Sequence, residues 1–296
     1  MTDRFTSIAE IGWPALRRHP DFRAAVERNA AGIVAQKDRL SPVARWLTND
    51  LGRTAVLSRL LFHTAREGAV TASDLIAATR SRHTSSIGRV LQVLRCAEAA
   101  GWIRVGDGEG DWSTRPLIAQ PAFMDLWRER ALIEIDSASL VAPRIQPALE
   151  LIESDAGLLG FLGHLARFDG IAPDARGPPN PSIRLFLEHE GGLTTLYDLI
   201  GRQDPDRVSL LEAAPFSRRR LATRFNVSRT HVARLFAAAA AAGHLSLATR
   251  SRVVFSKAMS DEAERHFALT FHAIATSAMA ALEDAKPARR NTAAGL

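Results

Sequence analysis

The chain lacks three features that would place it in a membrane or outside the cell. It has a single cysteine, Cys96, which excludes an internal disulfide and favours a reducing cytoplasm. No apolar run approaches the roughly 20 residues that a membrane-spanning helix needs, so we expect no membrane contact. The N-terminal residues have neither the apolar core nor the cleavage site of a signal peptide, which also indicates a cytoplasmic location.

Signals for enzyme chemistry are missing too. The nine histidines include no His-Glu-x-x-His pattern and have no Cys-x-x-Cys partner, so we expect neither a metal site nor a cofactor. The glycines of Gly157 to Gly163 (GLLGFLG) lie in an apolar helical run, without the preceding strand and the following Lys-Ser/Thr of a phosphate loop. They are better explained by a close contact between helices. We therefore expect no catalytic activity.

Acidic residues are absent from Ala213 to Ser260, a stretch that carries nine basic ones. Repulsion among so many positive charges lowers the stability of the fold, and binding of a polyanion would offset this loss. The net charge of +6 and the pI of about 10.5 are compatible with a nucleic-acid partner without requiring one. A solvated basic face on an ordinary helical pair remains the alternative. The basic residues are Arg218, Arg219, Arg220, Arg224, Arg229, Arg234, Arg250, Arg252 and Lys257.

The same stretch has the pattern of a helix-turn-helix. Leu221-Ala222 lies in a short first helix, and Phe225 to Val227 forms the turn, where Asn226 tolerates a positive φ better than most side chains. Ser228 caps a second helix, whose apolar residues recur at the spacing of one buried face. These residues are Val232, Leu235, Phe236 and Ala239. The outward face then presents Arg229, Thr230, His231, Ala233 and Arg234 to base edges and phosphates.

A basic hairpin follows this second helix. Two segments with strand character, His244 to Leu247 and Arg252 to Phe255, flank a tip at Ala248 to Ser251 that contains Arg250. Helix, turn, helix and hairpin together resemble the winged helix-turn-helix, in which the second helix reads a DNA groove.

The same order of elements is expected upstream. Helical patterns cover residues 1–40, broken at two prolines, and 42–68, followed by shorter helices at 71–80 and 84–100. A strand at 101–105, a tip at 106–111 and a returning strand at 112–118 lead to a closing helix at 121–141. In the second copy the closing helix is expected at 261–282, and residues 174–182 form a Pro/Gly-rich loop.

Aligned residues indicate an internal duplication at an offset near 140. We call residues 1–145 the first half and residues 146–284 the second half, each a winged-helix repeat with flanking helices. Residues 285–296 form a polar, basic tail that we expect to be disordered. The aligned pairs include Pro42 with Pro181, Arg45 with Arg184, Gly52 with Gly191, Leu57 with Leu196, Val90 with Val232 and Gly101 with Gly243.

A unit of about 140 residues with leading helices, a winged helix-turn-helix and a closing helix is similar to the MarR family of bacterial transcription regulators. The resemblance implies a dimer joined by terminal helices, with each recognition helix in one major groove of a pseudo-palindromic operator. Here both halves are fused, so the expected fold is mainly α with small β-wings, as tandem duplicated winged helix-turn-helix domains in a pseudo-twofold dimer. The family's Asp-x-Arg pairing in the wing is echoed loosely by Asp111 and Arg115.

The two halves are not expected to bind DNA equally. The tip of the first hairpin carries Asp107, Glu109 and Asp111, whose charges would be repelled by phosphates. We predict an asymmetric site with most of the affinity from the second half. The predicted DNA-binding residues are Arg218, Arg219, Arg220, Ser228, Arg229, Thr230, His231, Arg234, Arg250 and Arg252 in the second half, with Thr84, Ser85, Ser86 and Arg89 in the first.

The sequence thus favours a transcription regulator that binds double-stranded DNA in sequence-specific fashion as a single-chain pseudo-dimer. A plasmid-type replication initiator and a tandem winged-helix protein-interaction module are the alternatives. Trp46, Trp102 and Trp127 could line a pocket for a small-molecule effector, although core packing explains them more simply. Cys96 is better explained by packing than by redox sensing. Pairing of two chains into a further homodimer stays open.

Overall fold

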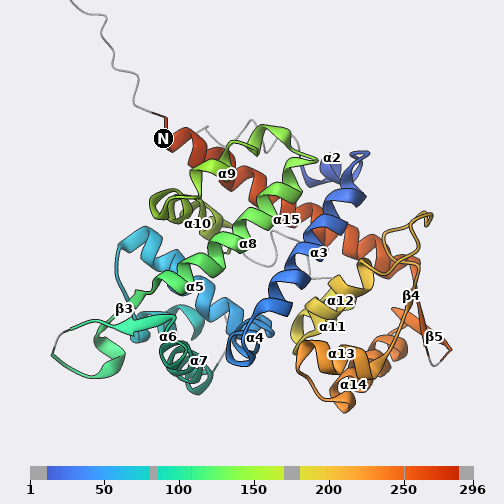
Figure 1. Ribbon diagram of the computed structural model, residues 1–296, viewed down its shortest axis with the longest axis horizontal. Helices are drawn as coiled ribbons and strands as arrows, with labels where there is room; N and C mark the ends of the chain where they lie inside the picture. Colours follow the sequence, from blue (N-terminus) through green and yellow to red (C-terminus); the bar gives the residue numbers. More distant parts are fainter. Residues whose placement is uncertain (1–11, 81–85, 108, 170–180, 250, 287–296) are drawn as a thin grey trace, which may run out of the picture.

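The computed structural model describes residues 12–80, 86–107, 109–169, 181–249 and 251–286. It is mainly helical and has two small antiparallel sheets, which confirms the coarse fold class (Figure 1). Several predictions fall outside the described residues. They concern Thr84, Ser85 and Arg250, most of the loop at 174–182, and most of the tail.

The leading helices of the first half are shorter and more numerous than predicted. One continuous helix was expected over residues 42–68, but the chain breaks at Asn49-Asp50 because Asp50 adopts an extended conformation and caps the next helix. Its carboxylate accepts the backbone N–H of Arg53 at 2.9 Å. Gly68, with φ of 78°, ends that helix as predicted. The helices are α2 (Trp13–Arg17), α3 (Phe22–Arg39), α4 (Pro42–Thr48) and α5 (Leu51–Glu67).

A unit of two helices and a small antiparallel sheet follows. Thr71 and Asp74 cap its first helix reciprocally, since each side chain accepts the other's backbone N–H. The hairpin pairs Ile103 with Ala119 and Val105 with Leu117. The elements are β1 (Val70–Thr71), α6 (Ala72–Arg80), α7 (Ile87–Ala99), β2 (Ile103–Val105), η1 (Trp112–Thr114), β3 (Pro116–Ala119) and the closing helix α8 (Pro121–Ser139).

The second half repeats this order of elements, without counterparts of α2 and η1 among its described residues. A connection of η2 (Pro143–Ile145) and α9 (Ala148–Leu151) leads into it. Its leading helices are α10 (Asp155–Asp169), α11 (Pro181–Glu188) and α12 (Gly192–Ile200). The unit of helices and sheet comprises β4 (Ala213–Pro215), α13 (Arg218–Phe225), α14 (Arg229–Ala241), β5 (Leu245–Thr249) and β6 (Arg252–Phe255), and the closing helix is α15 (Lys257–Asp284).

The two units of helices and sheet agree in detail. Their sheets have the orders β1-β3-β2 and β4-β6-β5, with the last hairpin strand in the middle of each. Helices α7 and α14 each have 13 residues and a serine cap. Gly101 and Gly243 follow them with φ of 70° and 72°. The aligned pair Gly52 and Gly191 is different, because Gly52 lies inside α5 whereas Gly191 precedes α12 with φ of 67°.

The halves pack on each other reciprocally. Helix α3 contacts α8 of its own half and α12 of the other, while α10 contacts α15 of its own half and α5 of the other. The closing helices α8 and α15 also touch, and they cross the middle of the molecule with α3 (Figure 1). Buried apolar residues of both halves form one continuous core. Neither half therefore has a core of its own.

The tryptophans mostly serve this packing. Trp102 stacks on Phe123 at a ring distance of 5.5 Å, and Trp127 meets the edge of the same ring at 6.3 Å. Trp46 lies apart from them, under the guanidinium of Arg53 at 4.3 Å. The arrangement supports the core-packing interpretation of these side chains.

The glycine-rich run lies within α10, as the apolar helical pattern predicted. A methyl group on Gly157 would lie 1.9 Å from the carbonyl oxygen of Leu151, so the helix begins in direct contact with the preceding turn. Gly163 faces Ala65 of α5 at ordinary contact distance, whereas Gly160 has nothing within 4 Å. The contact between helices that the run predicts is therefore made with α5 at Gly163, whereas the closest approach, at Gly157, is to the preceding turn.

Candidate nucleic-acid interface

The helix-turn-helix of the second half forms as its sequence predicts. The hydroxyl of Ser217 accepts the N–H of Arg220 at 3.3 Å and starts α13. Asn226 ends that helix in the left-handed region, with φ of 53°. Leu221 and Phe225 are almost fully buried. The turn is thus fixed by a cap at one end and a left-handed residue at the other.

Helix α14 buries the predicted face. Val232, Leu235, Phe236 and Ala239 are each 2% exposed or less. The ring of Phe236 lies 4.2 Å from that of Phe216, which directly precedes Ser217. Because these apolar contacts fix the rotation of α14, the opposite side of the helix has to face solvent.

That solvent side carries arginines that have no carboxylate partner among the described residues. Arg229, Thr230 and Arg234 are exposed, and neither arginine contacts a carboxylate within the described part of the chain. The same holds for the exposed Arg218 and Arg219 on α13. An arginine held by no carboxylate keeps its donor groups available for phosphates or base edges.

His231 departs from the predicted outward set. Its Nε2 lies 2.9 Å from the carbonyl oxygen of Glu190, and its ring is 5.8 Å from that of His189. It occupies the third position of α14, where the helix still touches the loop before α12. Its N–H also binds the hydroxyl of Ser228, 3.0 Å away, so Ser228 is engaged as the helix cap.

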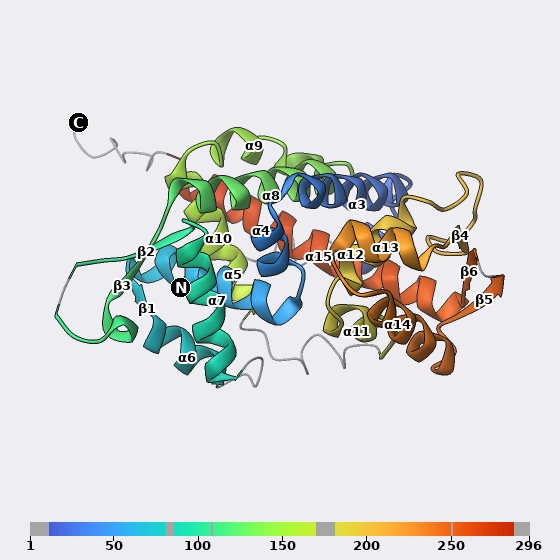
Figure 2. The same cartoon turned by 60° about the horizontal axis from the view of Figure 1, so that its bottom comes forward.

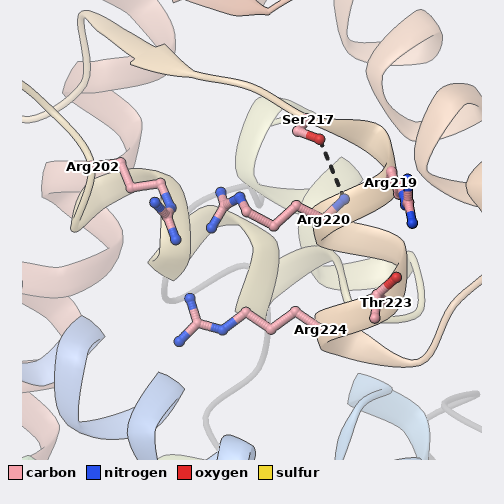
Figure 3. Close-up of a pocket in the computed structure, with 6 residues that line it drawn as sticks. All are labelled: Arg202, Ser217, Arg219, Arg220, Thr223 and Arg224. Atoms are coloured by element: carbon pink, nitrogen blue, oxygen red, sulfur yellow. Dashed lines mark hydrogen bonds between the residues drawn. The ribbon is translucent and has the colours of Figure 1, made fainter.

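Arg220 and Arg224 of α13 are tied to carboxylates. Asp198 of α12, with a side chain 2% exposed, accepts from Arg220 Nη2 at 2.6 Å, from Arg202 Nε at 2.9 Å and from Arg224. Asp38 of α3 is the second partner of Arg224. Hydrogen bonding to Arg224 lowers the pKa of the Asp38 carboxyl, and the same contact raises the pKa of the Arg224 guanidinium. Figure 3 shows the guanidinium groups of Arg202, Arg220 and Arg224 turned toward one another.

The second hairpin is short and carries exposed polar residues. Thr249 pairs with Arg252, and a register irregularity lies between Leu247 and Thr249. Arg252 is exposed, while Leu245, Val253 and Phe255 are buried beneath the hairpin.

Helix α7, the corresponding helix of the first half, presents fewer unpaired cations than α14. Ser86 caps α7 by accepting the N–H of Arg89 at 3.3 Å, and Arg89 Nη2 lies 3.2 Å from a carboxylate oxygen of Asp50. Arg95 stacks on Trp112 at 3.9 Å. Arg89 and His231 occupy the same third position of their helices, and both turn back to the loop between the leading helices of their own half.

The first hairpin is acidic at its exposed end. Asp107, Glu109 and Asp111 are all exposed. Arg115 donates through Nε to the carbonyl oxygen of Gly106 at 2.9 Å, within its own hairpin. The loosely suggested pairing of Asp111 with Arg115 is therefore replaced by a backbone contact.

Helices α7 and α14 lie on one side of the molecule. In Figures 1 and 2, α7 and α14 lie along the same lower side, and the two hairpins project at opposite ends. The two units thus present helix and hairpin toward one common surface.

The structure also holds polar residues that the motifs did not indicate. Asp198 was missed because its partners Arg220 and Arg224 follow more than 20 residues later, although its spacing to Arg202 is that of a helical ion pair. Asn49 was missed as well. Its Nδ2 donates to the Phe225 carbonyl at 2.8 Å, and its own carbonyl accepts from Gly191 at 2.7 Å, so it joins the two halves beside the turn.

Other kinds of site were sought in the same residues. No group of three or more His, Cys, Asp or Glu side chains is arranged to hold a metal ion among the described residues. No helix in the described ranges is long and apolar enough to cross a membrane. Comparisons with protein-family models, with curated proteins and with solved structures return no match.

Proposed function

We propose that the protein is a transcription regulator that binds double-stranded DNA through α14 of its second half. The observation that supports this most is the exposed row of Arg229, Thr230 and Arg234, in a stretch without acids. Its two arginines have no carboxylate partner in the described chain. A buried apolar face holds this row rigidly toward solvent. Rigid presentation lowers the entropic cost of binding a groove.

The roles follow from residue chemistry. An arginine on a helix in the major groove can donate two bonds to guanine, and threonine contacts bases or phosphates. Arg218 and Arg219 at the start of α13, and Arg252 on the hairpin, are placed to neutralise phosphates on either side. Release of counterions by these cations would supply much of the affinity.

The shared strand order and the reciprocal packing support an origin by duplication and a pseudo-twofold arrangement. The first half contributes less to binding in this proposal, because Arg89 is tied to Asp50 and the first hairpin is acidic. The operator is then asymmetric, with one strong half-site. Its weak half-site lies toward α7.

Selection of duplexes from a random-sequence pool tests the proposal. The full chain should enrich one conserved half-site, flanked by a weakly conserved segment. Genome-wide occupancy should then place that sequence at promoters. Absence of enrichment above a matched pool without protein would contradict DNA reading, and enrichment of two equal half-sites would contradict the asymmetry.

A further inference from the structure

A recess of about 630 Å³ lies beside α13 (Figure 3). Four arginines and two hydroxyl residues line it, and no carboxylate is in the lining. Arg202 comes from the end of α12, outside the helix-turn-helix, so the sequence motif alone does not account for this recess. The lining residues are Arg202, Ser217, Arg219, Arg220, Thr223 and Arg224.

The buried carboxylate of Asp198 holds three of these arginines in place. It accepts from Arg202, Arg220 and Arg224, and Asp38 accepts two further bonds from Arg224. Guanidinium groups that are already oriented lose less freedom when they bind an anion. Arg219 is exposed and lines the other side of the recess, with its guanidinium apart from those three (Figure 3).

Arg202, Arg220 and Arg224 have more N–H donors than the two carboxylates accept from. Three guanidinium groups carry about fifteen N–H donors in total, and the structure gives them six hydrogen bonds to Asp198 and Asp38. The remaining donors are left for solvent or a bound acceptor. Four positive charges also outnumber the two carboxylates that hold them.

An oxyanion with several oxygens suits this arrangement best. A phosphate offers three or four acceptor oxygens to converging guanidinium groups, and arginine binds it through paired bonds. A carboxylate offers two oxygens only. Hydroxyl groups such as that of Thr223 can donate to the same ligand.

We propose that this recess binds a phosphate group, supplied either by the backbone of bound duplex DNA or by a free phosphorylated compound. Only the first source rests on the proposed function. In both cases Arg202 and Arg219 are binding residues, and Asp198 positions the site without touching the ligand.

The test uses the full chain and inorganic phosphate at constant ionic strength. The midpoint of thermal unfolding should rise with phosphate in a saturable way. Arg219→Gln and Arg202→Gln should each raise the half-saturating concentration about tenfold, as expected for loss of a charged hydrogen bond. Arg144→Gln, with the same loss of charge in the exposed connection η2 outside the recess, should leave it unchanged. Arg219 is exposed without a carboxylate partner in the described chain, so its variant should fold normally, which circular dichroism checks.

Duplex binding by the same variants distinguishes the sources. If inorganic phosphate has no effect but Arg202→Gln and Arg219→Gln each lower the salt slope of duplex affinity by about one, the phosphate is that of the backbone. If phosphate binds and the slope is unchanged, the ligand is a free compound. If neither quantity changes, the phosphate site is refuted, and the proposed function stands or falls separately on the Arg229 variant. If the wild-type chain binds phosphate but no duplex, the proposed function is refuted and the phosphate site is not.

Discussion

Asn226 holds the left-handed backbone that joins α13 to α14. It is the only residue other than glycine with a positive φ in the described part of the chain. Asn226→Gly should leave the free energy of unfolding nearly unchanged, whereas Asn226→Val should lower it by about 1–2 kcal/mol, because a β-branched side chain is strained there. Urea unfolding of both variants measures this. Equal stability of the two variants would contradict the claim that the positive φ at position 226 limits which side chains fit there.

His266 makes stability depend on pH. Burial of His266 in α15 lowers its pKa from 6.5 to about 4, because the protonated imidazole loses its contact with water there. Between these values the unfolded chain binds a proton that the folded chain does not, so stability falls as pH falls through that window. One such group contributes a slope of at most about 1.4 kcal/mol per pH unit. His266→Leu should flatten the profile measured by urea unfolding between pH 7 and pH 4, relative to wild type, and an unchanged slope would contradict this assignment.

At the scale of single elements, the two glycines of α10 should respond in opposite directions. Gly157→Ala places a methyl group 1.9 Å from the Leu151 carbonyl, so the backbone must shift and the variant should lose stability, by about 1–3 kcal/mol as in other overpacked sites. Gly160→Ala meets nothing within 4 Å and should gain up to about 1 kcal/mol from helix propensity. Differential scanning calorimetry compares them. If Gly160→Ala lost as much stability as Gly157→Ala, the packing argument would be contradicted.

Elements whose signals are local in sequence could be predicted. The cap at Ser228, the turn at Asn226 and the buried face of α14 all depend on residues within a few positions of one another. The break at Asn49-Asp50 could not, because the helical pattern continues across it. That break is stabilised by the cap of Asp50 and by contacts from Asn49 to the second half.

In the candidate site, too, local sequence predicted some features and only the tertiary fold determined others. Exposure of Arg229 and Arg234 follows from helical periodicity, since the buried face fixes the opposite one. The positions of His231, Arg220 and Arg89 depend on Glu190, Asp198 and Asp50, residues from other elements that only the tertiary fold brings near. Sequence spacing therefore indicated which helix presents arginines to solvent, but overestimated how many of the predicted side chains are free.

At the scale of the whole molecule, the shared core predicts that both halves unfold together. All five tryptophans lie between Trp13 and Trp127, so tryptophan fluorescence reports on the first half, while far-UV circular dichroism reports on helices of both. The two urea transitions should coincide, as in two-state unfolding. An earlier or later fluorescence transition would show that the halves are independent domains.

The claim that α14 reads duplex DNA is tested most directly by the affinity of three variants for the selected duplex. Arg229→Gln and Arg234→Gln should each weaken binding about tenfold, as expected for loss of a base or phosphate contact. Arg144→Gln serves as the control, because Arg144 is an exposed arginine in η2, in the connection between the halves, and the same charge is lost. The control should bind like wild type. Wild-type affinity in all three variants would contradict the account.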